Sequence, residues 1–387
     1  MTNTKPLSLS YVSLAGLALF FIAMGSCRFS YPPVMPLMIT EHWSTLPQAG
    51  YLGSANFVGY FFGVVLAPIL GRTMARSTML IGILLIAIVS LFFCTWNLGF
   101  DWLFFWRLLN GIAGGSLMVL VPSLVLTNTP QRSKGLVTGI MFSGIGIGTI
   151  VLSEMVPLLD RLGGIAAIWL GFTGITLVMA IIAYPLIMRT AMPLLQKPAA
   201  KDRLTGNVKT ALLWGAAAYF IYGLGITPHY LFLADYARQA LHANLNISSL
   251  LFSVQGVGLA MGGLIGGLLK DWLGTYKGLL VMVVVSAISI ILVLAFHDSW
   301  ALGVSGFLMG MSVMQVVLLM SLHLDDLVGV ERHAQYWSKV TMCYAIAQFV
   351  GGYGFSGLLA LHLPYISMFW VGLGFMVVTF GLYLKMR

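Results

Sequence analysis

The chain of 387 residues consists mainly of apolar stretches that are each long enough to cross a lipid bilayer. A helix needs about 20 predominantly apolar residues to span the hydrocarbon core. Hydrophobic residues make up 59% of the sequence and charged residues 8%, whereas soluble domains carry about 25% charged residues. Backbone polar groups inside a bilayer must be satisfied within the protein, so we predict an all-α membrane protein. Twelve spans are expected, at residues 9–39, 48–71, 77–97, 102–126, 135–158, 165–188, 210–236, 247–269, 278–296, 300–322, 336–360 and 365–384.

Lysine and arginine residues predict the orientation of these spans. If the N-terminus is cytoplasmic, sixteen basic residues fall on the cytoplasmic side and three on the other, with Arg28 inside the membrane. The positive-inside rule then places both termini in the cytoplasm. The pattern predicts a multi-pass protein of the inner (cytoplasmic) membrane, in contact with the lipid bilayer. Because the basic residues are scattered between apolar stretches and not gathered on one face, no nucleic-acid partner is expected.

The longest polar connection, from residue 189 to 209, lies between the sixth and seventh spans. Linkers are segments that few contacts cross. The sequence therefore predicts an N-terminal six-helix bundle at 1–188, a cytoplasmic linker at 189–209 and a C-terminal six-helix bundle at 210–387.

The two predicted halves share a sequence pattern. A shift of 199 residues superimposes Gly59 on Gly258, Gly63 on Gly262, and Tyr31 on Tyr230. One shift that fits several positions indicates a duplicated, pseudo-symmetric bundle. Parallel repeats of this kind are typical of transporters whose substrate binds between the halves near the midplane.

Three motifs resemble those of the major facilitator superfamily (MFS). The run Gly267-Leu-Leu-Lys-Asp-Trp-Leu-Gly-Thr-Tyr-Lys277 is similar to the loop signature of that family, with matches at Gly267, Leu269, Asp271, Gly274 and Lys277. Arg107-Leu-Leu-Asn-Gly-Ile-Ala-Gly-Gly115 is similar to its Arg-x-x-x-Gly-x-x-Gly pattern. Glycines in the fifth span, among them Gly144 and Gly148, resemble its gating motif. The resemblance implies the MFS fold and transport by alternating access.

Two further runs, Arg28-Phe-Ser-Tyr-Pro-Pro and Gly50-Tyr-Leu-Gly-Ser-Ala-Asn-Phe-Val-Gly59, resemble the YbfB-type branch of the superfamily. One departure stands against the family pattern. Between the second and third spans, where the family has its stronger loop signature, the run Leu70-Gly-Arg-Thr-Met-Ala-Arg-Ser77 contains no acidic residue. Only the second-half copy of the loop signature is carried over.

Arg28 is the strongest candidate for a substrate-binding residue. An arginine at membrane depth is costly and usually faces a bundle interior or an aqueous cavity. Its planar guanidinium suits a carboxylate or phosphate group. The alternative is a structural arginine that binds carbonyls freed by Pro32, Pro33 and Pro36. Tyr31 follows three residues later, and on a helix it would share the face of Arg28 and steer its guanidinium or stack on substrate.

Glu154 is the only carboxylate well inside a predicted apolar span, and burial favours its protonated form. It is therefore the first candidate for proton coupling. The alternative is an ion pair with Arg107 on the periplasmic side, which would become a switch if protonation broke it.

His229 and Tyr230 lie in the seventh span, at the repeat position of the Arg28 region, and are candidates for substrate binding, with His229 also a candidate for coupling. The alternative for His229 is a satisfied interior residue. Asp235 is expected at the periplasmic rim. Asn110, Gln255 and Gln315 either line the cavity or connect helices.

The leading prediction is a secondary active transporter, not an enzyme, that moves a small anionic organic solute with coupling to protons. No cofactor and no metal site are expected, since the sequence lacks nucleotide-binding loops and metal-ligand spacings. We expect a monomer. Two alternatives remain open: an efflux pump for amphipathic compounds that works as an H⁺ antiporter, and a membrane-embedded enzyme or sensor.

Overall fold

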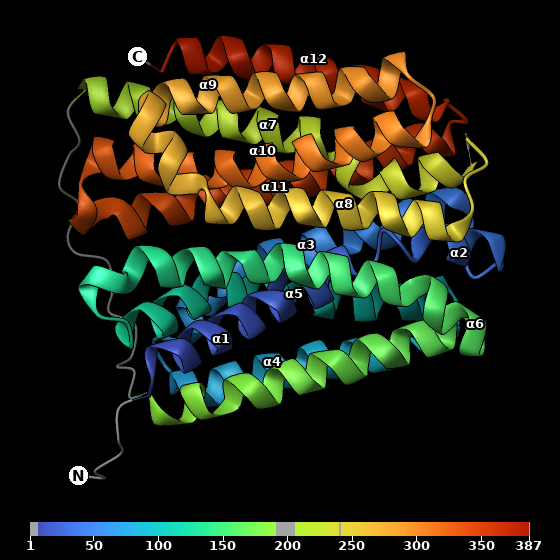
Figure 1. The fold of residues 1–387 in the computed structure, drawn as a ribbon, viewed down its shortest axis with the longest axis horizontal. Coiled ribbons are helices and arrows are strands. Elements are labelled where there is room, and N and C mark those ends of the chain that lie inside the picture. The colour runs from blue at the N-terminus through green and yellow to red at the C-terminus, as the bar shows by residue number, and fades with distance from the viewer. Residues whose placement is uncertain (1–6, 191–205, 240, 387) are drawn as a thin grey trace.

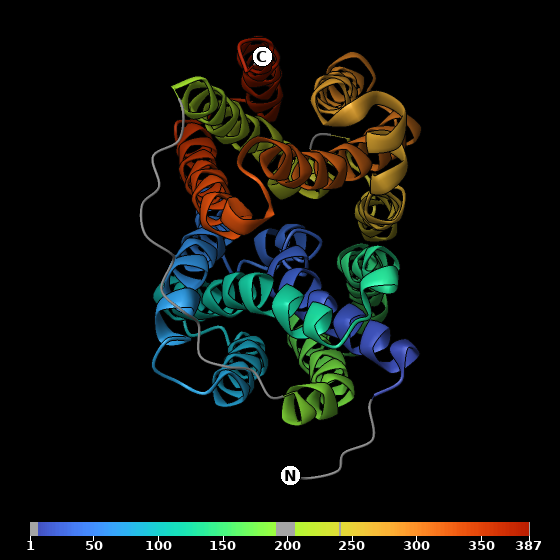
Figure 2. The ribbon, with the colours of Figure 1, turned by 90° about the vertical axis from the view of Figure 1, so that its left-hand side faces the viewer.

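The computed structural model describes residues 7–190, 206–239 and 241–386, and the regular structure within these ranges is helical. The elements in chain order are α1 (Leu9–Phe20), the π-helix η1 (Phe21–Phe29), α2 (Met35–Thr40), α3 (Leu46–Leu70), α4 (Arg76–Phe93), α5 (Phe100–Thr127), η2 (Gln131–Ser133), α6 (Lys134–Arg189), α7 (Gly206–Gln239), α8 (Leu245–Leu264), α9 (Gly266–Ala295), α10 (Ser299–Val328), α11 (Val330–Ala360) and α12 (Tyr365–Leu384). The long helices run side by side (Figure 1). Seen from one end, α1 to α6 form one group and α7 to α12 the other (Figure 2).

Ten helices in the described ranges are long and apolar enough to cross a membrane. One of them, α6, is a helix of 56 residues that is broken at Gly163 and Gly164, where Gly164 has a φ of +63°. Its two arms fold back against each other (Figure 1) and correspond to the predicted spans 135–158 and 165–188. The helix α11 is not among the ten. The all-α prediction is confirmed, and the count of twelve spans stays a prediction.

The first predicted span, 9–39, is not one continuous helix. After α1 the backbone continues as a π-helix, turns at residues 30–34 and resumes as the short helix α2. Proline cannot donate a backbone hydrogen bond, and its ring clashes with the preceding turn. The prolines at 32 and 33 therefore end the helix, and Pro36 lies in the first turn of α2, where no donor is needed.

Glycines bring pairs of helices into backbone contact at equivalent places in the two groups. A Cβ atom on Gly59 would collide with the carbonyl of Leu108, and one on Gly258 would collide with the carbonyl of Phe307. Both the glycines and their partners differ by 199 positions. Small residues permit such close helix approach. The shift seen in the sequence thus recurs in the packing of α3 on α5 and of α8 on α10.

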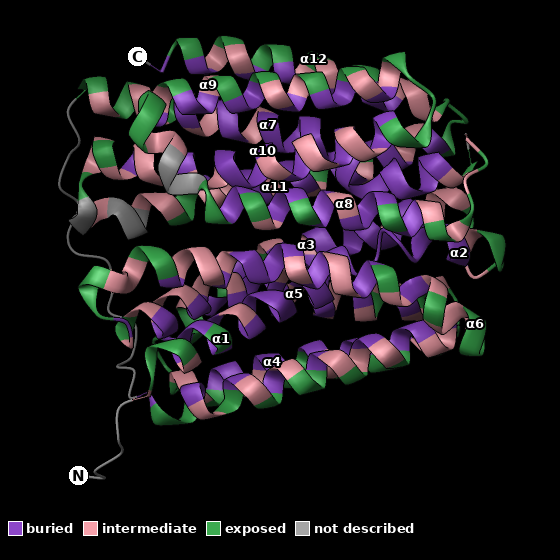
Figure 3. Cartoon of the chain, viewed as in Figure 1, coloured by how far each residue is buried: buried purple, intermediate pink, exposed green. Residues whose placement is uncertain are grey.

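Two seams join the groups: α6 packs on α8, and α3 packs on α11. A Cβ atom on Gly146 would collide with the carbonyl of Gly256 in the first seam, and one on Gly50 would collide with Ser356 in the second. Buried residues concentrate where helices meet (Figure 3). The outer faces expose large apolar side chains, as expected of surfaces that contact lipid, including Leu85, Leu170 and Val377.

Candidate functional site

The π-helix η1 carries Arg28 at its C-terminal end. A π-turn holds an extra residue, changes the direction of the following side chains and often occurs at functional sites. Two polar side chains satisfy carbonyls in this irregular stretch. Ser30 Oγ donates to the Ser26 carbonyl at 2.6 Å, and Asn56 Nδ2 donates to the Cys27 carbonyl at 2.7 Å. These contacts are not made by Arg28, so the structural alternative for that arginine has no support in the described contacts.

The guanidinium of Arg28 is surrounded by aromatic rings. Its central carbon lies 4.7 Å from the ring centre of Phe57, 5.0 Å from that of Tyr60 and 5.8 Å from that of Phe29. The residue is only 5% exposed. Among the described residues, no carboxylate forms an ion pair with it and no hydrogen bond of its guanidinium is found. The cation is thus held by ring faces and keeps its hydrogen-bond donors free for another group.

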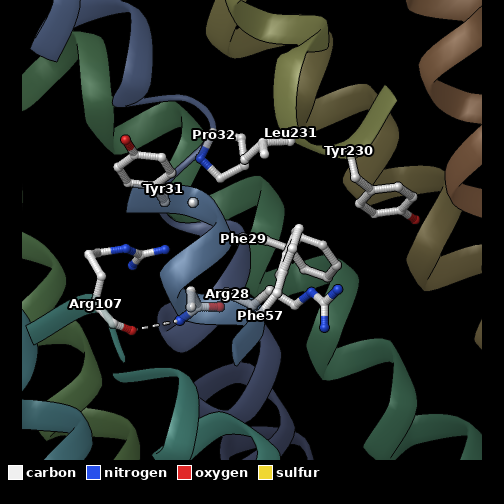
Figure 4. A pocket seen from close by; sticks show the side chains of 10 residues that line it. Arg28, Phe29, Tyr31, Pro32, Phe57, Arg107, Tyr230 and Leu231 are labelled. Carbon is white, nitrogen blue, oxygen red and sulfur yellow. Dashed lines mark hydrogen bonds between the residues drawn. The ribbon is translucent and has the colours of Figure 1, made fainter. Parts of the chain in front are cut away.

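A small cavity lies beside Arg28, at the boundary between the two groups of helices. Its volume is about 10 Å³, which is room for about one water molecule. The first group and the turn after η1 contribute most of the lining, while α7 contributes Tyr230 and Leu231 (Figure 4). The full lining is Arg28, Phe29, Tyr31, Pro32, Gly53, Asn56, Phe57, Arg107, Tyr230 and Leu231.

Further tyrosines from the second group lie near Arg28. Tyr219, Tyr230 and Tyr344 are close enough for their hydroxyls to interact electrostatically with the guanidinium. The rings of Tyr219 and Tyr344 are stacked, with centres 4.5 Å apart. Of the three, Tyr230 lines the cavity, and its hydroxyl has no hydrogen-bond partner in the described part of the chain.

Arg107 is a second buried arginine in the same cavity, and it contacts Tyr31. Its central carbon lies 4.5 Å from the ring centre of Tyr31, and its Nη1 donates to Asn110 Oδ1 at 3.4 Å. Figure 4 shows Tyr31 with Arg107 on one side of η1, while Arg28 points to the other side, towards Tyr230. The prediction that Tyr31 steers Arg28 is therefore wrong. The reason is the backbone: the spacing rule for three residues holds for an α-helix, whereas here a π-helix runs into a turn.

Glu154 does not pair with Arg107. Its side chain is exposed on α6 and accepts a hydrogen bond from Ser253 Oγ of α8 at 2.5 Å. The prediction of an ion pair is wrong because Arg107 points inward within the first group, while Glu154 faces the seam between α6 and α8. The expected burial of Glu154 is wrong as well.

His229 lies outside the cavity. It is fully buried, with Nε2 2.7 Å from Ser305 Oγ and 3.3 Å from Ser289 Oγ. Consecutive helix residues point about 100° apart, so Tyr230 reaches the cavity and His229 turns to α9 and α10. The prediction of His229 as a substrate-binding residue beside Arg28 is therefore wrong. Its Nε2 is hydrogen-bonded, as the interior alternative expects, while its Nδ1 is buried and has no partner in the described ranges.

The three amide candidates divide between two roles. Asn110 Nδ2 donates to Ser90 Oγ at 2.9 Å, and Gln315 Nε2 donates to the Gly262 carbonyl at 2.9 Å, so both connect helices. Gln255 is buried beside the Tyr230 hydroxyl. Neither the amide atoms of Gln255 nor that hydroxyl makes a hydrogen bond of normal geometry in the described part of the chain. Gln255 therefore stays a candidate next to the cavity.

Among the motif residues, two glycines lie at contacts between helices and a third lies at a helix break. Gly144 faces the carbonyl of Leu17, and a Cβ atom on Gly25 would lie 2.9 Å from the Gly148 Cα, so these glycines allow α6 to pack directly on α1 and η1. Asp271 and Lys277 are exposed on α9, and Gly274 between them has a φ of +72°. A left-handed conformation favours glycine because it has no Cβ atom.

Two polar contacts were missed from the sequence. Asp235, expected at the rim, is fully buried and accepts a hydrogen bond from the Tyr365 hydroxyl. Thr275 Oγ1 donates to Asp326 Oδ2 at 3.1 Å and lies 3.2 Å from His323 Nδ1. Both join residues far apart in the chain, and no local pattern indicates them. Within the described ranges, no three His, Cys, Asp or Glu side chains form a group that could hold a metal ion.

The sequence of this chain matches a known protein family. The profile of a family described as "Uncharacterised MFS-type transporter YbfB" matches residues 20–383. The "Uncharacterized MFS-type transporter YceJ" of Bacillus subtilis is 25% identical over 280 residues, which is 68% of either chain. The "Inner membrane transport protein YdhP" of Escherichia coli K12 is 24% identical over 297 residues, 72% of this chain and 71% of that one.

A solved structure shares the fold. The crystal structure of a point mutant of the nucleoside transporter NupG matches with a TM-score of 0.74 and 13% identity, over 97% of this chain and 99% of that one. At this identity the likeness shows the architecture alone. Together with the family match, it confirms the resemblance drawn from the motifs, and the chain is a transporter of the MFS and not an enzyme. It belongs to the YbfB-type family of MFS transporters.

Proposed function

We propose that this transporter moves a small organic solute with an anionic group across the inner membrane by alternating access, driven by protons. The observation that carries the proposal is Arg28: a buried cation at the boundary between the two halves, without a carboxylate partner in the described part of the chain. A buried charge without a partner is costly. An anionic substrate would supply the missing partner, and the planar guanidinium would bind it through two parallel hydrogen bonds.

The lining of the cavity supports a site shared by two moving halves. We assign residues 1–188 and 210–387 as these halves, with Arg28 in one and Tyr230 in the other. Their seams are rich in glycine, as at Gly146, so that backbones slide without interlocking side chains. A cavity for about one water molecule corresponds to a closed state, and substrate access would require the seams to part.

An efflux pump for amphipathic or cationic compounds is the second candidate. The aromatic rings around Arg28 favour it. A pump for cations would need Arg28 to be neutralised by a carboxylate, and no described carboxylate does so. The anionic substrate is therefore the better-supported proposal. Monomeric assembly and cytoplasmic termini belong to the same proposal.

Thermal-shift screening of the purified protein against organic acids, sugars and drugs tests the substrate class. We expect an organic acid to stabilise the wild type and to have no effect on Arg28→Ala. Arg28→Lys keeps the charge but loses the planar fork, so its affinity should fall about tenfold or more. Arg132→Ala removes a cation from an exposed position and is the matched control. Equal stabilisation of the wild type and Arg28→Ala by the same acid would overturn the assignment.

Proteoliposomes loaded with the acid found in the screen test the coupling. An imposed pH gradient should drive accumulation against the concentration gradient of the acid. Accumulation that is insensitive to the pH gradient and to a protonophore would exclude proton coupling while leaving the substrate class intact.

A further inference from the structure

Asp235 on α7 is 0% exposed, and it is the only buried carboxylate among the acidic residues whose burial the structure describes. One of its oxygens, Oδ2, accepts a hydrogen bond from the Tyr365 hydroxyl of α12. The other, Oδ1, is buried and has no hydrogen-bond partner in the described ranges. An ionised carboxylate buried in this way is costly unless it is fully paired. The open position at Oδ1 therefore points to something that binds there.

The charged and titratable groups around Asp235 do not neutralise it. Tyr365 faces it from α12, and Tyr31 approaches from the turn after η1, closely enough for an electrostatic interaction. Arg238, on the same helix, is only partly buried, and it interacts at a distance without an ion pair. None of these groups forms an ion pair with Asp235 in the described part of the chain.

Two neutral groups complete the surroundings of the carboxylate. Gln239, one helical turn later on α7, brings its side-chain amide near Asp235 without a hydrogen bond of normal geometry to Oδ1. On the α8 side the nearest polar contact is the Ser248 hydroxyl, which donates to the Ala234 carbonyl at 2.8 Å. Neither group carries a charge, so neither offsets that of an ionised Asp235.

An open cleft of about 380 Å³ lies next to this region, and one of its lining residues is Tyr365, the hydrogen-bond partner of Asp235. Tyr365 lines the cleft and donates to the buried Asp235 at the same time, so this one side chain connects the cleft with the carboxylate. The cleft lies at the bundle end opposite the start of α1 and the end of α12 (Figure 1). Under the orientation predicted from the basic residues, this end faces the periplasm. The complete lining is Tyr236, Leu241, His297, Pro364, Tyr365 and Ile366.

The same helix connects Asp235 with the Arg28 cavity. Leu231, which lines that cavity, precedes Asp235 by four residues on α7. Four residues make about one helical turn, a rise of about 6 Å. Asp235 and a residue that closes the Arg28 cavity therefore lie about one turn apart on the same helix.

We propose that Asp235 is the proton-binding carboxyl of the transport cycle and that Tyr365 gates its access from the cleft. The proton binds at Oδ1 and neutralises the carboxylate, and no other bond has to form or break. A metal cation would need several oxygen ligands, whereas the Tyr365 hydroxyl already donates its hydrogen to Oδ2. This inference deepens the proposed function, because it rests on proton coupling and names the residue that performs it.

Infrared difference spectroscopy tests proton binding without any substrate. The purified protein in lipid vesicles is titrated with protons alone, and the carboxylic-acid C=O stretch is followed from acidic to alkaline pH. Asp235→Asn should lose one titrating band, and Glu154→Gln, which changes an exposed carboxylate, should retain it. Retention of the band in Asp235→Asn overturns the inference, and so does its loss in Glu154→Gln, since the proton would then bind at Glu154.

Tyr365→Phe provides a second variant that keeps the carboxyl. Without its donor the carboxylate takes up a proton more readily, so the band of Asp235 should persist to higher pH than in the wild type. An unchanged titration in Tyr365→Phe would remove the gating role. These measurements do not depend on the identity of the substrate. If the thermal-shift screen on Arg28 fails, the proposed substrate class is refuted but the role of Asp235 is not. If the infrared titration fails, the role of Asp235 is refuted but the substrate class is not.

Discussion

The guanidinium carbon of Arg107 lies 4.5 Å from the ring centre of Tyr31, and the hydroxyl of that ring donates to the Ala49 carbonyl at 2.7 Å. This contact fixes the turn after the π-helix to α5 and to α3 at once. Arg28, only three residues earlier, points to the opposite side of η1 (Figure 4). The two buried arginines thus have different surroundings. Arg107 supports the local structure, and Arg28 faces the second half of the chain.

The Tyr31 contact predicts a graded loss of stability. Tyr31→Phe removes the hydrogen bond to Ala49 and should cost about 0.5–1.5 kcal/mol. Tyr31→Leu also removes the ring under Arg107 and should cost about 0.5–2 kcal/mol more. Thermal unfolding of the purified variants measures both steps. Equal midpoints for the two variants would show that the ring does not stabilise the arginine.

The aromatic rings around Arg28 predict an effect on affinity. Phe57→Leu removes the nearest ring face, and a cation–π contact of about 0.5–2 kcal/mol corresponds to a roughly 2- to 30-fold weaker Kd for the anionic substrate. The measurement is titration with the acid found by thermal-shift screening. Phe62→Leu changes an exposed ring on the same helix and is the control. A wild-type Kd for Phe57→Leu would mean that the ring does not position the guanidinium.

The repeated glycine contacts predict equivalent damage in both halves. Gly59→Ala and Gly258→Ala each place a methyl group against a backbone carbonyl, and overpacking of this kind costs typically about 1–3 kcal/mol. Gly82→Ala adds the same methyl group on α4, where nothing lies within 4 Å. Thermal midpoints should therefore fall for the first two variants and not for the third. Alanine is also the better helix former, so a fall for Gly82→Ala of the same size would contradict the packing explanation.

The seam between α6 and α8 predicts an effect on transport itself. Gly146→Ala pushes against Gly256 and Ala260 of the other half, while Gly174→Ala on α6 meets nothing within 4 Å. We expect a several-fold lower transport rate for Gly146→Ala with little change in substrate affinity, because the closed state is the one disturbed. Initial rates of uptake and binding assays on both variants check this. Equal rates for the two variants would mean that this seam does not move during transport.

His229 is predicted to be structural. His229→Leu removes the hydrogen bond to Ser305 and should lower stability by about 1 kcal/mol. Accumulation driven by a pH gradient should continue at the wild-type level, since the residue contacts neither the cavity nor the cleft. Loss of that accumulation in a folded His229→Leu protein would show that His229 takes part in proton coupling.

Much of the architecture could be predicted from the sequence. Apolar stretches of membrane-spanning length leave helices as the solution, because a lipid environment offers no hydrogen bonds to an open backbone. The glycines at 59 and 258 indicated the repeat, and the motifs at Arg107, Gly144 and Asp271 indicated the MFS. Arg28 could also be singled out, since a charge at membrane depth is rare enough to be conspicuous on its own.

Only the tertiary structure decided which side chains meet. Glu154 looked buried because its neighbours in the chain are apolar, yet apolar residues on a membrane protein face lipid and other helices alike, so it lies exposed in a seam. Asp235 looked like a rim residue because it lies at the end of the predicted span 210–236, yet it is fully buried and Tyr365 of α12 donates to it. Burial and pairing depend on contacts between segments that are far apart in sequence. Hydropathy along one segment therefore indicates whether that segment can cross the membrane, and the packing of the other helices decides what its polar groups do.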